Sequence, residues 1–251
     1  MNKILVLGGG SWGTTLGNLL AEKDHDVSLW ARNLKIFKKV KNNWVNNHYL
    51  PKYKLSQNLK IVSNLKDAFK DVELVIIAIP SKGFRSISSK ISKYLDNQKI
   101  LIASKGIENK SFMTMSEVFI DETNYLKKNI MVLSGPNIAD EIMRKNISAS
   151  VIAGSDKKSL NHVSDLFNSD FFKIFLSNDT KGIEMAGALK NLYAICSGLS
   201  DGLGFESNTK AMLLTRSLSE MSELFKKINA NPLTLLGLSG VGDLIATSSS
   251  E

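Results

Sequence analysis

The first residues of the chain combine an apolar run with closely spaced glycines. Residues 3–7 read Lys-Ile-Leu-Val-Leu and lead directly into Gly8-Gly-Gly10-Ser-Trp-Gly13, after which residues 14–23 favour a helix. In such a loop Gly8 allows a tight turn, Gly10 lets a pyrophosphate approach the backbone, and Gly13 lets the helix pack closely. The first N–H groups of the helix then face the phosphates. The sequence predicts a dinucleotide-binding loop; the alternative is a glycine-rich turn without a ligand.

The preferred dinucleotide is predicted from the end of the second expected strand, residues 26–30. An NAD-selective site carries an acidic residue there for the ribose 2′-hydroxyl, whereas an arginine accommodates a 2′-phosphate through its planar donors. This chain has Ala31-Arg32-Asn33 at that point. NADP is therefore favoured as the cofactor and NAD stays possible, because Arg32 could also be one more solvated cation in a lysine-rich chain.

Lys105 follows a predicted strand at a position where a side chain could reach a ligand. Two further strands are followed by Pro80-Ser81 and by Ser134-Gly-Pro-Asn137. Ligands of open α/β sheets bind at the carboxyl ends of the strands, so we expect Lys105 to point into a crevice beside the cofactor. For each segment alone, a surface loop is the alternative.

Lys190 lies in the middle of a predicted helix and is surrounded by small residues. Ala186, Gly187 and Ala194 stand three or four residues away and share its helix face. A face of small residues lets a second body, either the sheet or a ligand, approach closely. The alternative is a lysine whose stem packs on the helix while its amine reaches solvent.

The elements that must position these residues alternate between strands and helices. Apolar runs predict strands at residues 4–7, 27–30, 74–79, 99–103, 130–134 and 150–153, with another possible at 172–176. Helical stretches lie between most of them. The pattern predicts the α/β class, with an N-terminal Rossmann-type doubly wound parallel sheet buried on both faces.

The pattern changes at Ser177-Asn-Asp-Thr180, which are helix-capping residue types. Beyond this point the sequence predicts helices at 180–200 and 207–229 and a short helical segment from Asn231. We therefore expect an NAD(P)-binding Rossmann domain over residues 1–178 and an all-helical substrate domain over residues 179–251.

The composition argues against several other classes of protein. Of the 251 residues, 43% are hydrophobic and 22% are charged, and the net charge of +8 suits phosphorylated ligands. No arginine-rich block appears, so no nucleic-acid partner is expected. Cys196 is the only cysteine, which excludes a CxxC metal site, and we expect no metal. Without a signal peptide or a membrane-spanning run, the chain is expected to be cytoplasmic.

Several short blocks give the sequence a resemblance to one family. In chain order they are Gly8-Gly-Gly-Ser-Trp-Gly13, Tyr49-Leu-Pro51, Ser104-Lys-Gly106, Ser134-Gly-Pro136, Gly187-Ala-Leu-Lys-Asn191, Asp201-Gly-Leu-Gly204 and Gly240-Val-Gly-Asp243. Together they resemble NAD(P)-dependent sn-glycerol-3-phosphate dehydrogenases of the bacterial type. The resemblance implies an oxidoreductase that interconverts sn-glycerol 3-phosphate and dihydroxyacetone phosphate and so supplies phospholipid synthesis. A homodimer is a possible assembly.

The same resemblance implies roles for individual residues. Lys190 matches the proton acceptor, and Asp243 matches a residue that orients its amine or helps the proton leave. A lysine accepts a proton only when it is neutral, and burial and a nearby cation such as Lys105 both favour that form. Substrate positions fall on Lys105, Gly135, Asn137, Lys190, Asn191, Asp243 and Thr247. Cofactor positions fall on Gly8, Gly10, Ser11, Trp12, Gly13, Arg32, Tyr49, Lys105 and Ala139.

Two departures from the family pattern stand out. Asn137 replaces the usual Ser or Thr, which should keep a hydrogen bond. Family members also continue beyond Glu251 into an Arg-Asn pair that contacts substrate and cofactor. We therefore expect a C-terminally truncated chain with an incomplete helical domain, which binds NADP(H) but turns over glycerol 3-phosphate poorly or not at all.

Two other functions stay open at this point. One is a related two-domain dehydrogenase of another small hydroxy acid or phosphate, although the Gly-Pro-Asn and Gly-Val-Gly-Asp blocks argue against it. The other is a cofactor-binding fragment without activity.

Overall fold

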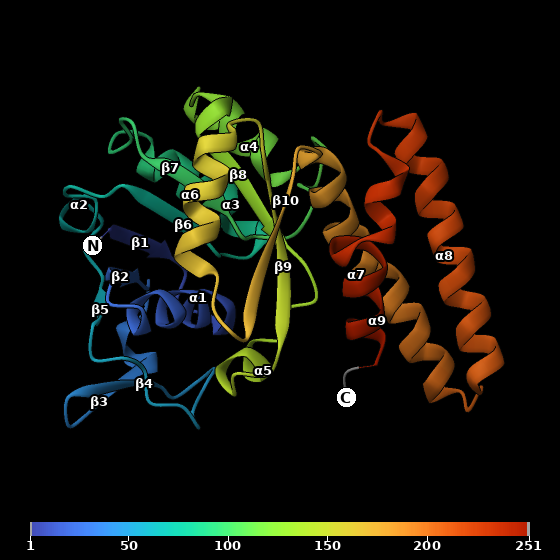
Figure 1. Ribbon diagram of the computed structural model, residues 1–251, viewed down its shortest axis with the longest axis horizontal. Helices are drawn as coiled ribbons and strands as arrows, with labels where there is room; N and C mark the ends of the chain where they lie inside the picture. Colours follow the sequence, from blue (N-terminus) through green and yellow to red (C-terminus); the bar gives the residue numbers. More distant parts are fainter. Residues whose placement is uncertain (1, 250–251) are drawn as a thin grey trace.

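The computed structural model describes residues 2–249, in which an eight-stranded sheet stands beside a group of helices (Figure 1). The strand order is β10-β9-β8-β7-β6-β1-β2-β5. These strands are β1 (Lys3–Leu7), β2 (Asp26–Trp30), β5 (Leu59–Val62), β6 (Leu74–Ile77), β7 (Lys99–Ile102), β8 (Ile130–Ser134), β9 (Ser148–Gly154) and β10 (Phe172–Ser177). The mostly parallel sheet confirms the predicted Rossmann-type fold.

Helices cover both faces of the sheet, which explains the continuous apolar runs of its strands. In β1, Ile4 and Val6 join a core with α1 (Ser11–Glu22), α5 (Ala139–Met143) and α6 (Lys157–Phe167). The alternate residues Leu5 and Leu7 join a second core with α2 (Leu65–Ala68), α3 (Ser81–Ser92) and α4 (Met115–Thr123). Two short 3-10 turns, η1 (Leu34–Ile36) and η2 (Lys127–Asn129), lie in the connections.

The expected parallel arrangement does not extend to one edge of the sheet. β9 runs antiparallel to β8, with Ser134 opposite Val151, and β10 runs parallel to β9. Residues 135–147 contain only the short helix α5, and an antiparallel neighbour needs no full crossover connection. As a result, the amino end of β9, and not its carboxyl end, lies beside the end of β8.

Three strands escape the apolar-run analysis. β3 (Phe37–Val40) and β4 (Asn43–Asn46) form an antiparallel hairpin outside the main sheet. β5 is an edge strand of the main sheet. The hairpin is rich in lysine and asparagine, which are poor indicators of a strand. β5 is short and exposes Lys60 between apolar residues.

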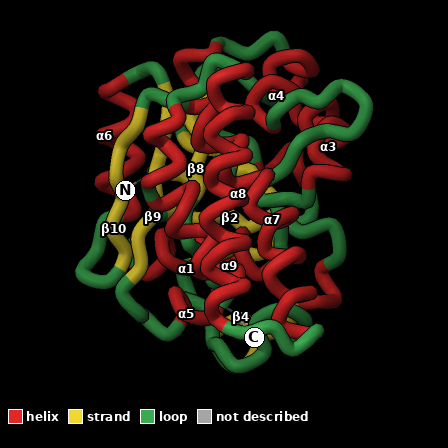
Figure 2. Tube along the Cα trace, turned by 90° about the vertical axis from the view of Figure 1, so that its right-hand side faces the viewer, coloured by secondary structure: helices red, strands yellow, loops and turns green. Residues whose placement is uncertain are grey.

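Helical structure follows the last strand. It comprises α7 (Thr180–Gly202), α8 (Ser207–Lys227), η3 (Pro232–Leu236), the π-helical turn η4 (Leu238–Gly242) and α9 (Asp243–Ser248). Figure 2 shows α7, α8 and α9 in front of the sheet when the molecule is turned by 90°. α7 begins at its cap Asp179, which accepts a 2.9 Å hydrogen bond from the Gly182 N–H. No described helix is long and apolar enough to cross a membrane.

Candidate functional site

The glycine loop has the geometry that its sequence predicts. Gly8 has a φ of +129°, and a Cβ there would lie 2.2 Å from the Ala78 carbonyl oxygen. A Cβ on Gly13 would lie 2.0 Å from the Gly8 carbonyl oxygen, so neither position tolerates a side chain. A Cβ on Gly10, by contrast, would meet nothing within 4 Å, and Gly10 caps α1 without a side-chain hydrogen bond. Gly10 therefore leaves room for a ligand at the start of α1, where the first N–H groups of a helix can bind a pyrophosphate.

The other predicted cofactor residues lie around this loop. Ser11 and Trp12 form the first turn of α1 and are half-buried. Arg32 lies exposed just beyond β2, and no described acidic residue pairs with it. Because the sequence has no Asp or Glu from residue 27 to residue 66, no acid of this segment opposes a 2′-phosphate.

The predicted positions Tyr49 and Ala139 belong to two segments that a hydrogen bond joins. Tyr49 is 48% exposed in the loop after β4. Further along that loop, the Tyr53 hydroxyl donates a 2.7 Å bond to Asp140 Oδ1 at the start of α5. Ala139 is the first residue of that helix. The loop after β4 therefore lies beside α5.

The three strand ends singled out in the sequence come together. Gly106 has a φ of +148°, and a Cβ there would lie 2.7 Å from the Ser81 Cβ. Lys105 Nζ donates a 2.9 Å hydrogen bond to the Gly135 carbonyl. Residues after β6, β7 and β8 thus form one rim, and Lys105 points across it towards the helices.

Lys105 and Lys190 reach one carboxylate from two sides. Lys190 Nζ lies 2.9 Å from Asp243 Oδ1, and Lys105 Nζ donates a short hydrogen bond to Asp243 Oδ2. Lys190 Nζ also donates to the Thr247 hydroxyl at 2.5 Å. Asp243 is 2% exposed and Lys190 is 8% exposed. The lysine–aspartate cluster, as we call Lys105, Lys190 and Asp243, contains two amines and one acid and so favours an anionic ligand.

Burial also changes the acid–base chemistry of this cluster. It lowers the pKa of the Lys105 amine, an effect that the Asp243 carboxylate opposes and the Lys190 ammonium strengthens. Removing a cation from water disfavours its charged form, and a second cation nearby does the same. The Lys105 amine therefore gives up its proton more readily than a solvated lysine would.

Tight backbone approaches place the helical members of the cluster. A Cβ on Gly187 would lie 2.7 Å from Ser134 Oγ, so this glycine lets α7 come against the end of β8, as the small-residue face around Lys190 predicts. A Cβ on Gly240 would lie 2.1 Å from the Leu235 carbonyl oxygen. Gly240 lies in η4, a turn that ends at the residue before Asp243. π-Helical turns of this kind recur at functional sites.

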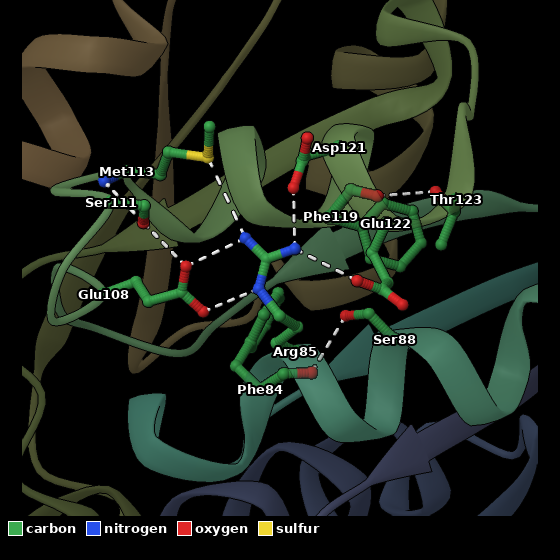
Figure 3. A network of polar contacts seen from close by, with 10 residues as sticks. All are labelled: Phe84, Arg85, Ser88, Glu108, Ser111, Met113, Phe119, Asp121, Glu122 and Thr123. Atoms are coloured by element: carbon green, nitrogen blue, oxygen red, sulfur yellow. Dashed lines mark hydrogen bonds and ion pairs between the residues drawn. The ribbon is translucent and has the colours of Figure 1, made fainter.

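A charged network holds the loop that begins at Lys105 (Figure 3). Arg85 on α3 donates two 2.8 Å hydrogen bonds to the two carboxylate oxygens of Glu108. It also bonds Asp121 at 2.6 Å and Glu122 at 3.0 Å, both on α4. The hydrogen bonds that Glu108 accepts from Arg85 and from the Ser111 hydroxyl lower its pKa to about 2. The sequence gives no signal for this network, because its members lie far apart along the chain.

Asn137 and Asn191 stand apart from the cluster's hydrogen bonds. The Asn137 amide donates to the Ala149 carbonyl at 3.2 Å and accepts from the Ser150 hydroxyl at 2.8 Å, so it holds the amino end of β9. Asn191 is exposed next to Lys190 and forms no hydrogen bond with a described side chain. One residue of the site was not predicted from the sequence: Asn46, which is fully buried and contacts the glycine loop.

The fold and site define a class of protein: a Rossmann-type sheet with a dinucleotide-fitting glycine loop, closed by helices that complete a lysine–aspartate cluster. Comparison with known families narrows this class. The profile of the "NAD-dependent glycerol-3-phosphate dehydrogenase N-terminus" matches residues 3–160, and that of the corresponding C-terminus matches residues 179–251. The chain belongs to the NAD-dependent glycerol-3-phosphate dehydrogenase family.

Individual relatives agree with this family. A glycerol-3-phosphate dehydrogenase [NAD(P)+] of Psychrobacter cryohalolentis is 44% identical over 99% of this chain, which spans 57% of that protein. One of Teredinibacter turnerae is 42% identical over 99% of this chain and 73% of its own length. The crystal structure of the enzyme from Coxiella burnetii superposes with a TM-score of 0.93 at 32% identity, covering 99% of this chain and 76% of that one.

Proposed function

We propose that this chain is an NAD(P)-dependent oxidoreductase that interconverts sn-glycerol 3-phosphate and dihydroxyacetone phosphate. The observation that carries the proposal is the contact of Lys105 and Lys190 with the buried Asp243, which joins the rim of the sheet to the helices. The excess of positive charge in the lysine–aspartate cluster suits a phosphorylated substrate. Membership of the family supports the same reaction.

Lys190 is the proposed proton carrier. In the oxidation its neutral amine takes the proton of the C2 hydroxyl, and in the reduction its ammonium returns that proton to the carbonyl oxygen. Asp243 orients the amine through the 2.9 Å contact, and Thr247 fixes it from a second direction. Lys105, held by the Gly135 carbonyl, adds positive charge beside the substrate.

The glycine loop is the proposed cofactor site, with NADP preferred and NAD possible. Once bound, the nicotinamide supplies or accepts the hydride. Gly8, Gly10 and Gly13 shape the loop, and Ser11 and Trp12 begin the helix that faces the phosphates. Arg32 is assigned to the 2′-phosphate. Tyr49, Lys105 and Ala139 complete the proposed cofactor contacts.

The remaining assignments are proposals of the same kind. Gly135, Asn137 and Asn191 line the substrate side, together with the lysine–aspartate cluster and Thr247. The chain divides into a nucleotide domain of residues 1–178 and a substrate domain of residues 179–251. We propose a cytoplasmic protein without a nucleic-acid partner that supplies glycerol 3-phosphate for phospholipid synthesis, with a homodimer as a possible assembly.

A substrate panel tests this function. Oxidation of NADPH is followed with dihydroxyacetone phosphate, with unphosphorylated dihydroxyacetone and with pyruvate. We expect turnover with the phosphorylated ketone alone, because the positive cluster needs an anion next to the reacting carbonyl. Faster turnover with pyruvate would instead identify a hydroxy-acid dehydrogenase. NADPH binding without turnover of any of the three compounds would instead identify a cofactor-binding fragment without activity.

A further inference from the structure

Asn46 lies in the hairpin strand β4. Among the described residues of the hairpin, it alone has a side chain that forms hydrogen bonds with the glycine loop. It is 0% exposed. Its Nδ2 donates to the Gly9 carbonyl at 3.0 Å and to the Thr14 hydroxyl at 2.9 Å, while its Oδ1 accepts from the Tyr49 N–H at 3.2 Å. The Gly9 carbonyl can only accept and the Tyr49 N–H can only donate, so these partners fix the orientation of the amide.

These contacts bear on the part of the loop that faces the phosphates. The carbonyl of Gly9 and the N–H of Gly10 belong to one planar peptide unit, so fixing the first fixes the direction of the second. Gly9 itself is closely packed, because a Cβ there would lie 2.7 Å from the Ala31 Cβ. Thr14 lies at the other end of the segment, just after Gly13. Asn46 therefore holds both ends of the segment from Gly9 to Thr14.

The hairpin that carries Asn46 is itself anchored. The Asn43 amide donates to the Leu55 carbonyl at 2.7 Å, and the Leu55 N–H donates to the Trp44 carbonyl, also at 2.7 Å. Only an uncharged amide supplies two donors and one acceptor at the position of Asn46. An aspartate of the same shape would set a carboxylate oxygen against the Gly9 carbonyl.

We infer that Asn46 is a positioning residue for the dinucleotide: it pre-orients the glycine loop so that the loop need not be ordered when the cofactor binds. This inference rests on the proposed cofactor site. A site whose donors are already in place binds more tightly because less ordering is required on binding. The β3–β4 hairpin thereby acts as a clamp on the loop, although it contributes nothing to the main sheet.

The test compares Asn46→Asp with a matched control, Asn18→Asp. Asn18 is 2% exposed on α1 and also bonds outside its helix, accepting from the Ser56 N–H at 2.7 Å, but it does not contact the loop. Calorimetry should show NADPH binding weakened by about 10- to 100-fold in Asn46→Asp, the cost of an unsatisfied buried group. Asn18→Asp should bind NADPH with an affinity within about twofold of the wild type, even if its melting temperature falls as much as that of Asn46→Asp.

A second readout does not need the cofactor. Amide hydrogen exchange of residues 9–13 in the free protein should be faster in Asn46→Asp than in the wild type and unchanged in Asn18→Asp. Asn46→Ser, which is smaller and uncharged, replaces Asn46→Asp if the latter does not fold. Unchanged exchange and unchanged NADPH affinity in the Asn46 variants would overturn the inference, as would an equal loss of affinity in Asn18→Asp. If the wild type itself fails to bind NADPH, the proposed function fails first.

Discussion

Asp243 is the residue on which the arrangement of the candidate site depends. It is nearly inaccessible to water, yet its two oxygens contact two amines that arrive from different parts of the chain. A buried carboxylate is stable as an anion only when it is paired and hydrogen-bonded. The same contacts fix Lys190 Nζ in one place, which a proton carrier requires. Positioning and charge compensation are therefore achieved by the same atoms.

Loss of Lys190 should slow the reaction without weakening cofactor binding. In Lys190→Met, which keeps the aliphatic stem, we expect turnover to fall by about 10²- to 10⁴-fold, the usual contribution of a general base or acid. The affinity for NADPH should stay near the wild-type value, because the amine contacts Asp243 and Thr247 and not the glycine loop. Steady-state kinetics and fluorescence titration measure the two quantities.

Lys181→Met provides the control on the same helix, since Lys181 is exposed at the start of α7. It should leave both turnover and affinity unchanged. Near-normal turnover in Lys190→Met would remove Lys190 from the mechanism.

Arg32 should distinguish the two cofactors. Replacing it in Arg32→Ala is expected to weaken NADPH by about 10- to 100-fold, as for a hydrogen bond to a charged group, and to leave NADH almost unaffected. Titration of both cofactors measures the difference, and Arg216→Ala, an exposed arginine on α8, serves as the control. Equal losses for NADPH and NADH would show that Arg32 binds a part common to both.

At the scale of elements, α7 is fastened to the sheet side by a buried acid. Glu184 accepts hydrogen bonds from the Ser116 N–H at 2.8 Å and from the Thr114 hydroxyl at 2.9 Å, both at the beginning of α4. Burial raises the pKa of Glu184, and these hydrogen bonds oppose the shift. The contact holds the helix that carries Lys190 against the helix that follows the Lys105 loop.

This raised pKa predicts how stability depends on pH. The folded state keeps the Glu184 proton to a higher pH than the unfolded state, so it binds more protons over the interval above the ordinary value of 4.5. The contribution of Glu184 to the free energy of unfolding should therefore fall as the pH rises from 4.5 through the raised pKa. Glu184→Gln has no titrating group at position 184, so its free energy of unfolding should depend less steeply on pH over this interval.

Denaturant unfolding between pH 4.5 and pH 7.5 measures this difference. Glu223→Gln, at an exposed position of α8, is the control and should leave the slope of the wild type unchanged in that interval. Identical slopes for wild type and Glu184→Gln would contradict the argument from burial.

At the scale of the whole molecule, the sequence was sufficient to predict the strands whose two faces are both buried. The run from Ile4 to Leu7 identifies a strand because both of its faces are covered, and the glycines after it predict the turn that leads into α1. Lys105 and Lys190 could be singled out by their positions, but their proximity to Asp243 was expected only from the family resemblance, since 138 residues separate Lys105 from that partner. Only the packing of α7 and α9 brings them together.

The elements that were missed share a different property. Asn46 belongs to a polar hairpin, and its amide donates to Gly9 and Thr14, which lie 37 and 32 residues earlier in the sequence. The reversed direction of β9 likewise depends on a short connection whose path the sequence pattern does not encode. Long-range polar contacts of this kind leave no periodic signal, because each side chain alone resembles a surface residue.

The most direct test of the proposed reaction is hydride transfer itself. NADPH carrying deuterium at C4 of the nicotinamide is incubated with the protein and dihydroxyacetone phosphate, and the product is examined by mass spectrometry and NMR. We expect glycerol 3-phosphate with one deuterium at C2, formed from only one of the two C4 epimers of the labelled cofactor. Bound NADPH with no deuterium in glycerol 3-phosphate, or label transferred equally from both epimers, would contradict the proposed reaction.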